Sequence, residues 1–369
     1  MIPAARIQHL RPSPIRAIAE GAPADAVPMG LGEPGWDLPE PARLALAGLQ
    51  GPCAYGPNAG LPELREAVGA WHGVSAPEVL LTSGSQGALY ALIQAYAGEG
   101  DAVLVPDPGF LAYPALARMA GAEPVPYGLA EDFTLDPGRF AAALDRAPRA
   151  RLALVNHPGN PTGAGATREA LAAVAEVCAR RGVLLIADEV YRELRLGAPA
   201  PTLREVTDEG IVLSSVSKAW GAPGLRVGWA LGRPSLLAPA GLVHAYMVTA
   251  PARPSQVAAL ALLRASDQVL AEAREHLRVR WEAFAAAFTA GFGHAPRPSP
   301  GGFYQWLPIP GGEDTMAFCL RLRDEGRVVV VPGNAFGDGG RGHVRVSYAG
   351  DPARIREGVA RLAPFWRNP

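Results

Sequence analysis

A lysine that follows a short apolar run and two serines could act as an amine nucleophile. The segment Ser215-Val216-Ser217-Lys218 comes directly after the apolar residues 211–213, and Arg226 lies eight residues beyond the lysine. A lysine at the end of a buried strand is partly desolvated, so it loses its proton more readily and can form an imine with a carbonyl group. A surface lysine in a turn would fit the same segment, so Lys218 alone is only a candidate nucleophile.

An acidic residue ends the most apolar run of the chain. Asp188 follows residues 183–187 and precedes Glu189 and Tyr191. A carboxylate at a buried strand end is costly unless it faces a cation, and a protonated pyridine nitrogen is such a cation. A metal ligand or a helix N-cap would also explain Asp188. The absence of nearby His or Cys residues weakens the metal interpretation.

A turn rich in proline and glycine follows another apolar run. Its residues are Asn156-His157-Pro158-Gly159-Asn160-Pro161-Thr162-Gly163. The side-chain amide of Asn160 could donate a hydrogen bond to a phenolate oxygen. The segment could equally mark only a tight turn.

Small residues separate a strand-like run from a helical pattern at Thr82-Ser83-Gly84-Ser85-Gln86-Gly87-Ala88-Leu89. Free backbone N–H groups and the positive end of a helix would bind a phosphate there. Ser and Gly at a helix start are also a common cap, so this segment by itself carries little weight.

These segments lie in a chain that alternates apolar runs with helical patterns. Strand-like runs occur at 79–81, 102–105, 152–155, 183–187, 211–213 and 227–231, and helical patterns at 86–96 and 169–180. Such alternation predicts a mostly parallel sheet covered by helices, in which ligands bind beyond the carboxyl ends of the strands. All four polar segments would then share one edge of the sheet.

The pattern changes after about residue 265. A long helical segment, 269–290, is followed by strand-like runs at 302–307, 328–331 and 343–347, which indicates a separate α+β unit. The first 40 residues are too short and irregular to fold alone. We therefore predict a large domain at 41–265 and a small domain built from 1–40 and 266–369.

Composition narrows the class of partner. The chain has 369 residues, with 34 Lys and Arg against 35 Asp and Glu. This balance favours a small-molecule partner over nucleic acid. Three widely spaced cysteines, Cys53, Cys178 and Cys319, provide neither a disulfide framework nor a metal site, and no apolar run is long enough to cross a membrane. We expect a cytoplasmic protein without a bound metal.

Taken in their order, the four polar segments resemble those of the class I and II aminotransferases of the aspartate aminotransferase superfamily, the fold type I enzymes that use pyridoxal 5′-phosphate. The resemblance covers nearly the whole chain. Further matching motifs are Leu31-Gly32-Glu33-Pro34, Tyr55-Gly56-Pro57, Gly60-Leu61-Pro62-Glu63-Leu64-Arg65 and Val344-Arg345-Val346-Ser347. The resemblance implies an α/β fold with a mostly parallel seven-stranded sheet in the large domain and a smaller α+β domain.

The resemblance also implies the residues of a cofactor site. Lys218 would carry pyridoxal phosphate as an imine and move the proton between the substrate Cα and the cofactor. Asp188 would pair with the pyridine nitrogen, while Asn160 and Tyr191 would hydrogen-bond the phenolic oxygen. Phe110 matches the aromatic residue that stacks on the ring, where the family more often has Tyr or Trp; an ordinary core Phe is the alternative. The phosphate would be held by Gly84, Ser85, Gln86, Ser215, Ser217 and Arg226.

On the substrate side, Arg345 matches the arginine that binds the α-carboxylate. Asn160 and Gly32 would lie nearby, with the glycine leaving small backbone groups opposite the carboxylate. Tyr55 and Thr249 match positions that reach the phosphate of a neighbouring subunit's site. The resemblance therefore implies a homodimer with its sites at the interface.

The implied reaction is ping-pong transfer of an amino group between an amino acid and a 2-oxo acid. Relatives with the same residues catalyse elimination, decarboxylation or ring formation, so a lyase, decarboxylase or cyclase is the first alternative. A ligand-sensing domain is the second alternative, and it is disfavoured because no DNA-binding segment precedes the motifs. We find no second arginine near 244–249 for an acidic side chain. Arg253, Arg192 and Trp220 are candidates for side-chain recognition.

Overall fold

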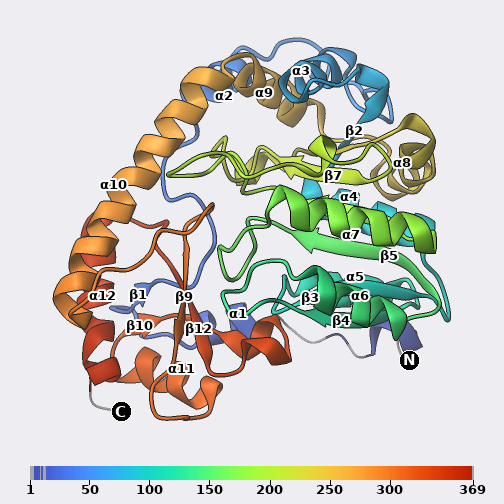
Figure 1. Ribbon diagram of the computed structural model, residues 1–369. Helices are drawn as coiled ribbons and strands as arrows, with labels where there is room; N and C mark the ends of the chain where they lie inside the picture. Colours follow the sequence, from blue (N-terminus) through green and yellow to red (C-terminus); the bar gives the residue numbers. More distant parts are fainter. Residues whose placement is uncertain (1–3, 9, 11–13, 368–369) are drawn as a thin grey trace.

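The computed structural model describes residues 4–8, 10 and 14–367. Residues 1–3, 9, 11–13, 368 and 369, which fall at the two ends of the predicted small domain, lie outside the described residues. Figure 1 shows the chain as a sheet covered by helices, with a second group of elements beside it and the long helix α10 (Ser266–Phe292) along one side.

A seven-stranded sheet forms the centre of the molecule. Its strand order is β2-β8-β7-β6-β5-β3-β4, and every neighbouring pair is parallel except the two pairs that involve β8. The predicted fold class, a mostly parallel seven-stranded sheet, is confirmed. The strands are β2 (Val79–Thr82), β3 (Ala102–Asp107), β4 (Glu123–Gly128), β5 (Ala150–Asn156), β6 (Leu184–Asp188), β7 (Ile211–Ser215) and β8 (Gly228–Leu231).

One strand, β4, has no counterpart among the apolar runs of the sequence. It reads Glu-Pro-Val-Pro-Tyr-Gly, and its two prolines lack the N–H groups that a central strand needs. It lies at the edge of the sheet, where only β3 pairs with it. An edge strand tolerates proline, so the position of β4 explains why its sequence does not show the apolar run of a buried strand.

Helices bury apolar residues on both faces of the sheet because the strands are apolar on both sides. One face packs against α4 (Gly84–Tyr96), α5 (Ala112–Met119) and α8 (Pro234–Val248). The other packs against α3 (Pro62–His72), α6 (Pro137–Asp145), α7 (Arg168–Arg181) and α9 (Arg253–Arg264). Local signals set several helix ends: Thr167 caps the start of α7, and Gly182 ends it in a left-handed conformation.

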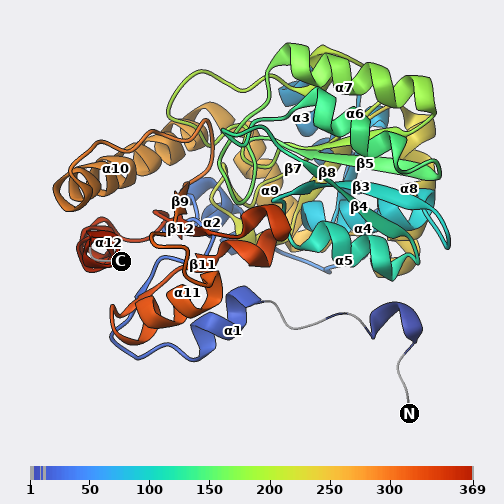
Figure 2. The same cartoon turned by 60° about the horizontal axis from the view of Figure 1, so that its bottom comes forward.

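The second unit is built from both ends of the chain. Strands β9 (Tyr304–Pro308), β12 (His343–Ser347) and β11 (Val331–Pro332) form an antiparallel sheet, and β1 (Val27–Pro28) pairs in parallel with β10 (Val328–Val329). The helices of this part are α1 (Pro14–Glu20), α11 (Thr315–Asp324) and α12 (Pro352–Arg367), and α12 packs along α10. Figure 2 shows α1 beside α11, so segments from opposite ends of the sequence share one unit. Helix α2 (Glu40–Ala47) packs instead on α9.

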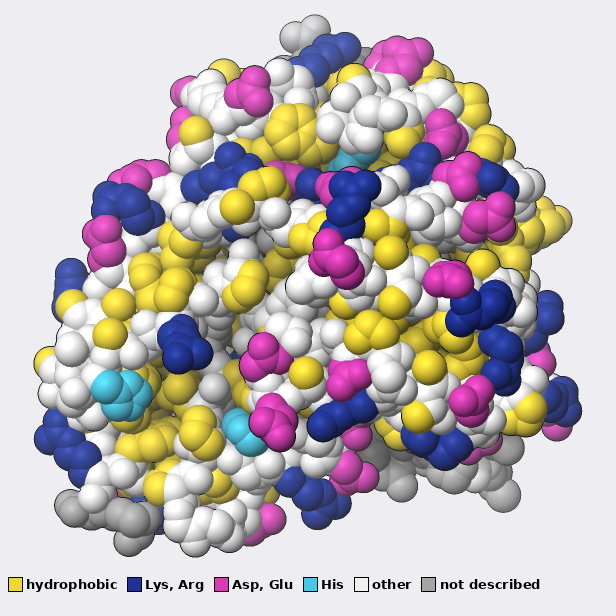
Figure 3. Space-filling model, viewed as in Figure 1, with side chains coloured by type: hydrophobic (Ala, Val, Ile, Leu, Met, Phe, Trp, Pro, Cys, Tyr) yellow, Lys and Arg dark blue, Asp and Glu magenta, His cyan; other side chains and the backbone are white. Residues whose placement is uncertain are grey.

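One face of the molecule can be described by the charges of its side chains. On the face shown in Figure 3, Lys and Arg side chains lie among Asp and Glu side chains. Within the described ranges, no helix combines the length and the hydropathy that a membrane crossing requires.

Candidate active site

A cavity of about 270 Å³ opens at the carboxyl ends of the parallel strands, where the central sheet meets β9, β12 and the N-terminal segment. This is the edge at which the polar segments were expected to meet. The predicted site residues that line it are Gly32, Ser85, Gln86, Phe110, Asn160, Asp188, Tyr191, Ser215, Ser217, Lys218, Arg226 and Arg345. Of the remaining two, Gly84 lies next to Ser85 and touches Arg226, whereas Tyr55 lies outside the cavity.

Lys218 projects into this cavity from the segment after β7. Its Nζ donates a 2.6 Å hydrogen bond to the backbone oxygen of Gly32 and lies 5.7 Å from the centre of the Tyr191 ring. The amine therefore spans the cavity between the sheet and the N-terminal segment. Among the described residues, its one hydrogen-bond acceptor is this carbonyl, which leaves the amine accessible from the cavity.

Asp188 ends β6 with its carboxylate buried. Only 4% of the residue is exposed, and burial raises the pKa of its carboxyl to about 6, although hydrogen bonds from the Tyr113 hydroxyl and the Val190 N–H oppose the shift. The Tyr113 hydroxyl donates at 2.8 Å. A buried carboxylate with so few partners is stabilised by a cation that faces it.

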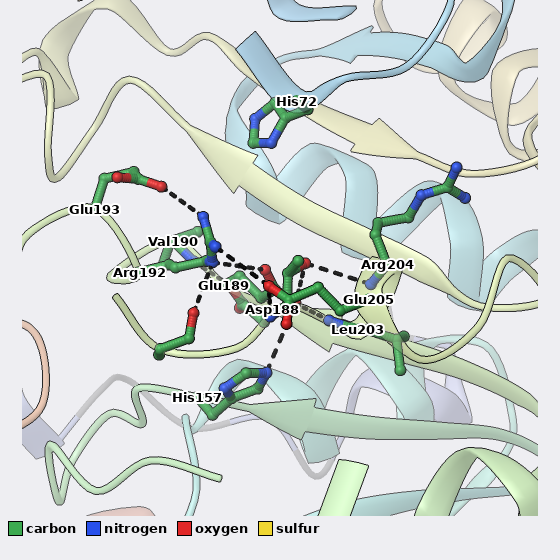
Figure 4. Close-up of polar contacts among 12 residues, drawn as sticks. His72, His157, Asp188, Glu189, Val190, Arg192, Glu193, Leu203, Arg204 and Glu205 are labelled. Atoms are coloured by element: carbon green, nitrogen blue, oxygen red, sulfur yellow. Dashed lines mark hydrogen bonds and ion pairs between the residues drawn. The ribbon is translucent and has the colours of Figure 1, made fainter. Parts of the chain in front are cut away.

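The loop after Asp188 is held by a buried acidic residue. Glu189 accepts hydrogen bonds from the Leu203 N–H at 2.8 Å and the Thr202 hydroxyl at 3.0 Å, and it lies 3.6 Å from Nε2 of buried His157. Figure 4 shows Glu189 between His157 and Leu203, directly beside Asp188. These contacts fix the backbone that carries both Asp188 and Tyr191.

The start of α4 forms a cradle for an anion. Gly84 has φ of +73°, and a Cβ there would lie 2.5 Å from the Arg226 guanidinium, so only glycine lets the two approach. Arg226 itself has φ of +54°. The N–H groups of the first helical turn, which have no acceptor within the helix, lie at this end of the cavity. The Arg226 guanidinium and the side chains of Ser85, Ser215 and Ser217 line the same end. Their chemistry suits a phosphate.

Sequence reasoning missed the group that holds this cradle in place. Nε2 of His244, in α8, accepts a 3.1 Å hydrogen bond from the N–H of Ser83. Burial lowers the pKa of His244, so its imidazole stays neutral and keeps an acceptor nitrogen. The apolar sequence of α8 does not indicate that its histidine contacts the start of α4.

Arg345 and Asn160 meet at the opposite end of the cavity. Arg345 is 3% exposed; its Nη1 donates to the side-chain oxygen of Asn160 at 2.7 Å and its Nη2 to the oxygen of Gly30 at 2.6 Å. Its buried Nε has no hydrogen-bond partner in the described part of the chain. With its oxygen taken by the arginine, Asn160 keeps its NH₂ group for a ligand oxygen.

Two tyrosines of the cavity were also missed. Tyr113 is the hydrogen-bond donor to Asp188, and Tyr304, from β9, bonds the hydroxyl of Tyr191 at 2.8 Å. Burial, reinforced by the nearby Tyr304 hydroxyl, raises the pKa of Tyr191 well above its ordinary value, so Tyr191 stays protonated. In the sequence, Tyr304 is only part of a strand-like run, and Tyr113 lies in none of the expected elements.

The remaining candidates lie away from the cavity lining. Tyr55 is 86% exposed and Thr249 is exposed. Arg192 bonds Glu193 and the Ala200 oxygen, and buried Trp220 donates to Ser266. Arg253 lies on the surface at the start of α9. Within this chain, therefore, none of the three side-chain candidates, Arg192, Arg253 and Trp220, reaches the cavity.

The doubly wound sheet, the small antiparallel unit and the lysine, aspartate and anion cradle at one strand edge define a fold type I enzyme of the pyridoxal phosphate class. The sequence profile described as "Aminotransferase class I and II" matches residues 29–362. The chain belongs to this family and is an aminotransferase, as predicted.

Known proteins resemble the chain over almost its full length. The aspartate/prephenate aminotransferase of Thermus thermophilus is 34% identical, with 97% of each chain covered, and the LL-diaminopimelate aminotransferase of Desulforudis audaxviator is 31% identical over 92% of this chain and 90% of its own. A structure of a Thermus thermophilus aspartate aminotransferase mutant superposes with a TM-score of 0.90 at 32% identity, covering 99% of this chain and all of that one.

Proposed function

We propose that this aminotransferase holds pyridoxal phosphate in the cavity and uses it for ping-pong transfer between an amino acid and a 2-oxo acid. The observation that supports this most strongly is that three groups of different chemistry face one cavity. An amine at Lys218, a buried carboxylate at Asp188 and an anion cradle at α4 face the same space. They match the aldehyde, the ring nitrogen and the phosphate of the cofactor.

The bound cofactor would supply an electron-withdrawing ring that stabilises negative charge at the substrate Cα. Asp188, ionised opposite the ring nitrogen, would keep that nitrogen protonated. Lys218 would take the proton from the substrate Cα and deliver it to the cofactor carbon that carried the aldehyde, so one amine serves as base and then as acid. Tyr191 and the NH₂ group of Asn160 would donate to the phenolic oxygen.

Arg345 would bind the α-carboxylate of both substrates. Its guanidinium is already oriented by Asn160 and Gly30, so little side-chain entropy is lost on binding. The described residues that bring positive charge to the cavity are Lys218, Arg226 and Arg345, all with a proposed role. A substrate side-chain carboxylate would need a further cation from a second subunit.

We also propose a homodimer. Helix α8 carries no charged residue from Pro234 to Val248, yet Leu242 and Tyr246 on it are 62% and 88% exposed. Tyr55, which lies outside its own cavity, would complete the phosphate site of the partner. Burying such a surface against a second copy is favourable because it removes apolar area from water.

Two further proposals concern location and domain boundaries. The three cysteines are free, which suits a reducing compartment such as the cytoplasm. The pairing of β1 with β10 supports a small domain made from residues 1–40 and 266–369, with the large domain at 41–265.

Visible absorption of the reconstituted enzyme tests the cofactor and the reaction together. Purified protein is saturated with pyridoxal phosphate, freed of excess, and mixed with single amino acids. We expect a visible band that bleaches with a donor amino acid and returns with a 2-oxo acid, and a Lys218→Ala variant that lacks the band of the wild type. Release of the amino group as ammonia, or of carbon dioxide, without transfer of the amino group to the added 2-oxo acid would contradict the proposed reaction.

A further inference from the structure

We propose that Tyr304 is a positioning residue that orients the Tyr191 hydroxyl through its own hydroxyl and the Arg345 guanidinium through its ring. It would thereby couple the cofactor-facing half of the cavity to the carboxylate-facing half. The inference rests on the proposed function, since it concerns groups that act on the cofactor and the substrate.

The hydroxyls of Tyr304 and Tyr191 form a hydrogen bond in which either oxygen could be the donor. Tyr304 and Tyr191 are 1% and 4% exposed, and their oxygens lie 2.8 Å apart. A phenol has one hydrogen and can accept at its oxygen. If Tyr304 donates to Tyr191, the hydrogen of Tyr191 is left to point elsewhere, and the cavity is where Tyr191 faces. In that arrangement Tyr191 remains available as a donor to a ligand oxygen.

The ring of Tyr304 lies under the guanidinium of Arg345. In the ladder between β9 and β12, Arg345 is opposite Trp306, and Tyr304 is two residues from Trp306 on the same face. This diagonal register places the Arg345 Cζ 4.4 Å from the centre of the Tyr304 ring. A buried cation over an aromatic face is attracted by it, so the ring helps to hold the guanidinium plane.

A third contact joins Tyr304 to the N-terminal segment. A Cβ at Gly32 would lie 1.9 Å from the Tyr304 hydroxyl oxygen. The structure therefore gives a reason for glycine at position 32 that differs from the expected one: the residue makes room for Tyr304. Because the oxygen of Gly32 accepts the hydrogen bond from Lys218, the tyrosine contacts the segment that holds the amine.

A second buried tyrosine shows what a purely structural role looks like. Tyr348 follows β12, is fully buried, and donates a 3.3 Å hydrogen bond to the oxygen of Gly302. It does not line the cavity. Tyr348→Phe removes one buried hydroxyl from the same part of the fold, so it is the matched control for Tyr304→Phe.

The test compares wild type, Tyr304→Phe, Tyr304→Leu and Tyr348→Phe, each loaded with pyridoxal phosphate. The first measurement is the pH midpoint of the visible absorption change. We expect it to rise by about one unit in Tyr304→Phe, since a misdirected Tyr191 stabilises the anionic phenolic oxygen less; one unit is a tenfold change in the protonation equilibrium. Tyr348→Phe should keep the wild-type midpoint.

The second measurement is the dissociation constant of propionate, a carboxylate without an amino group, from the change in absorption. Tyr304→Phe keeps the ring, so it should bind propionate within about twofold of wild type, whereas Tyr304→Leu should bind it about tenfold more weakly. If the leucine variant does not fold, Tyr304→Met replaces it.

An unchanged midpoint in Tyr304→Phe, or equal propionate binding in the ring-deleted variant, would overturn the corresponding part of the inference. A midpoint that shifts equally in Tyr348→Phe would assign the effect to general destabilisation. If wild type shows no visible band, the proposed function fails; a normal band with unaltered variants leaves that function intact and rejects only the role of Tyr304.

Discussion

The hydroxyl of Tyr113 donates a 2.8 Å hydrogen bond to Oδ2 of Asp188, and both residues are buried. This bond partly offsets the cost of a carboxylate at the end of a central strand. The remaining cost is visible in the pKa of Asp188, which burial raises from 3.8 to about 6. In the absence of a bound cation, the ionised aspartate therefore destabilises the fold.

Replacing Asp188 with asparagine should stabilise the cofactor-free protein at high pH. Because the folded-state pKa is raised, protonated Asp188 contributes stability that is present below about pH 4 and lost as the pH rises through about 6. Two units correspond to about 3 kcal/mol as an upper limit. Thermal unfolding of the cofactor-free protein should thus show Asp188→Asn above wild type at pH 8 and equal to it at pH 4.

The exposed Asp132 provides the control for this experiment. Hydrogen bonds from Thr134 lower its pKa, so Asp132→Asn should not stabilise the protein at pH 8. With pyridoxal phosphate present, the order should reverse at position 188, because only wild type offers a charge to the ring nitrogen. A cofactor that stabilised both proteins equally would refute the pairing.

Removing the hydroxyl of Tyr113 should move the titration of Asp188 further upward. The Tyr113 hydrogen bond lowers the pKa of that carboxyl, so Tyr113→Phe raises it above about 6. The cofactor binds to the ionised aspartate, so its affinity is lost as the pH is lowered. In Tyr113→Phe, fluorescence titrations between pH 5 and 8 should show this loss beginning at a higher pH than in wild type. Identical pH profiles would mean that Asp188 does not control binding.

The large features of this site could be predicted from sequence, whereas its supporting contacts could not. Lys218, Asp188 and Asn160 each follow an apolar run, and parallel strands bring their carboxyl ends to one edge. Tyr113, His244 and Tyr304 act through contacts between elements far apart in the chain, 75, 161 and 113 residues from their partners. Apolar periodicity reports which face of an element is buried, but not which atom of a distant element it meets.

The anion cradle at α4 depends on a glycine that two effects require. Gly84 has φ of +73°, and a Cβ there would meet the Arg226 guanidinium at 2.5 Å. Gly73 has a similar φ of +67° with nothing near its Cβ, so Gly73→Ala measures backbone strain alone. We expect Gly73→Ala to lose about 1 kcal/mol of stability and Gly84→Ala to lose at least as much. Only Gly84→Ala should lose cofactor affinity, by tenfold or more in equilibrium dialysis. Equal cofactor affinity in the two variants would remove Gly84 from the phosphate site.

His244 supports the same cradle from α8, and its loss should weaken cofactor binding without touching the cavity. His244→Ala leaves the Ser83 N–H without its acceptor, which costs about 1–3 kcal/mol where water cannot replace it. We expect a lower melting temperature and a several-fold weaker affinity for pyridoxal phosphate. The exposed His294→Ala is the control and should alter neither quantity. A normal affinity in His244→Ala would show that Ser83 needs no support.

A single charged substitution on the exposed face of α8 tests whether this face forms the dimer interface. In Leu242→Asp, a carboxylate would be buried against a second copy, and no cation lies on α8 to pair with it. We expect a shift from dimer to monomer in sedimentation experiments and, because Tyr55 would no longer reach the partner's site, weaker cofactor binding in the monomer. Val279→Asp, on the exposed side of α10, adds the same charge elsewhere and should stay dimeric. If both variants remained dimers, the interface would have to lie on another face. The proposal that Tyr55 reaches the partner's phosphate site would then be rejected.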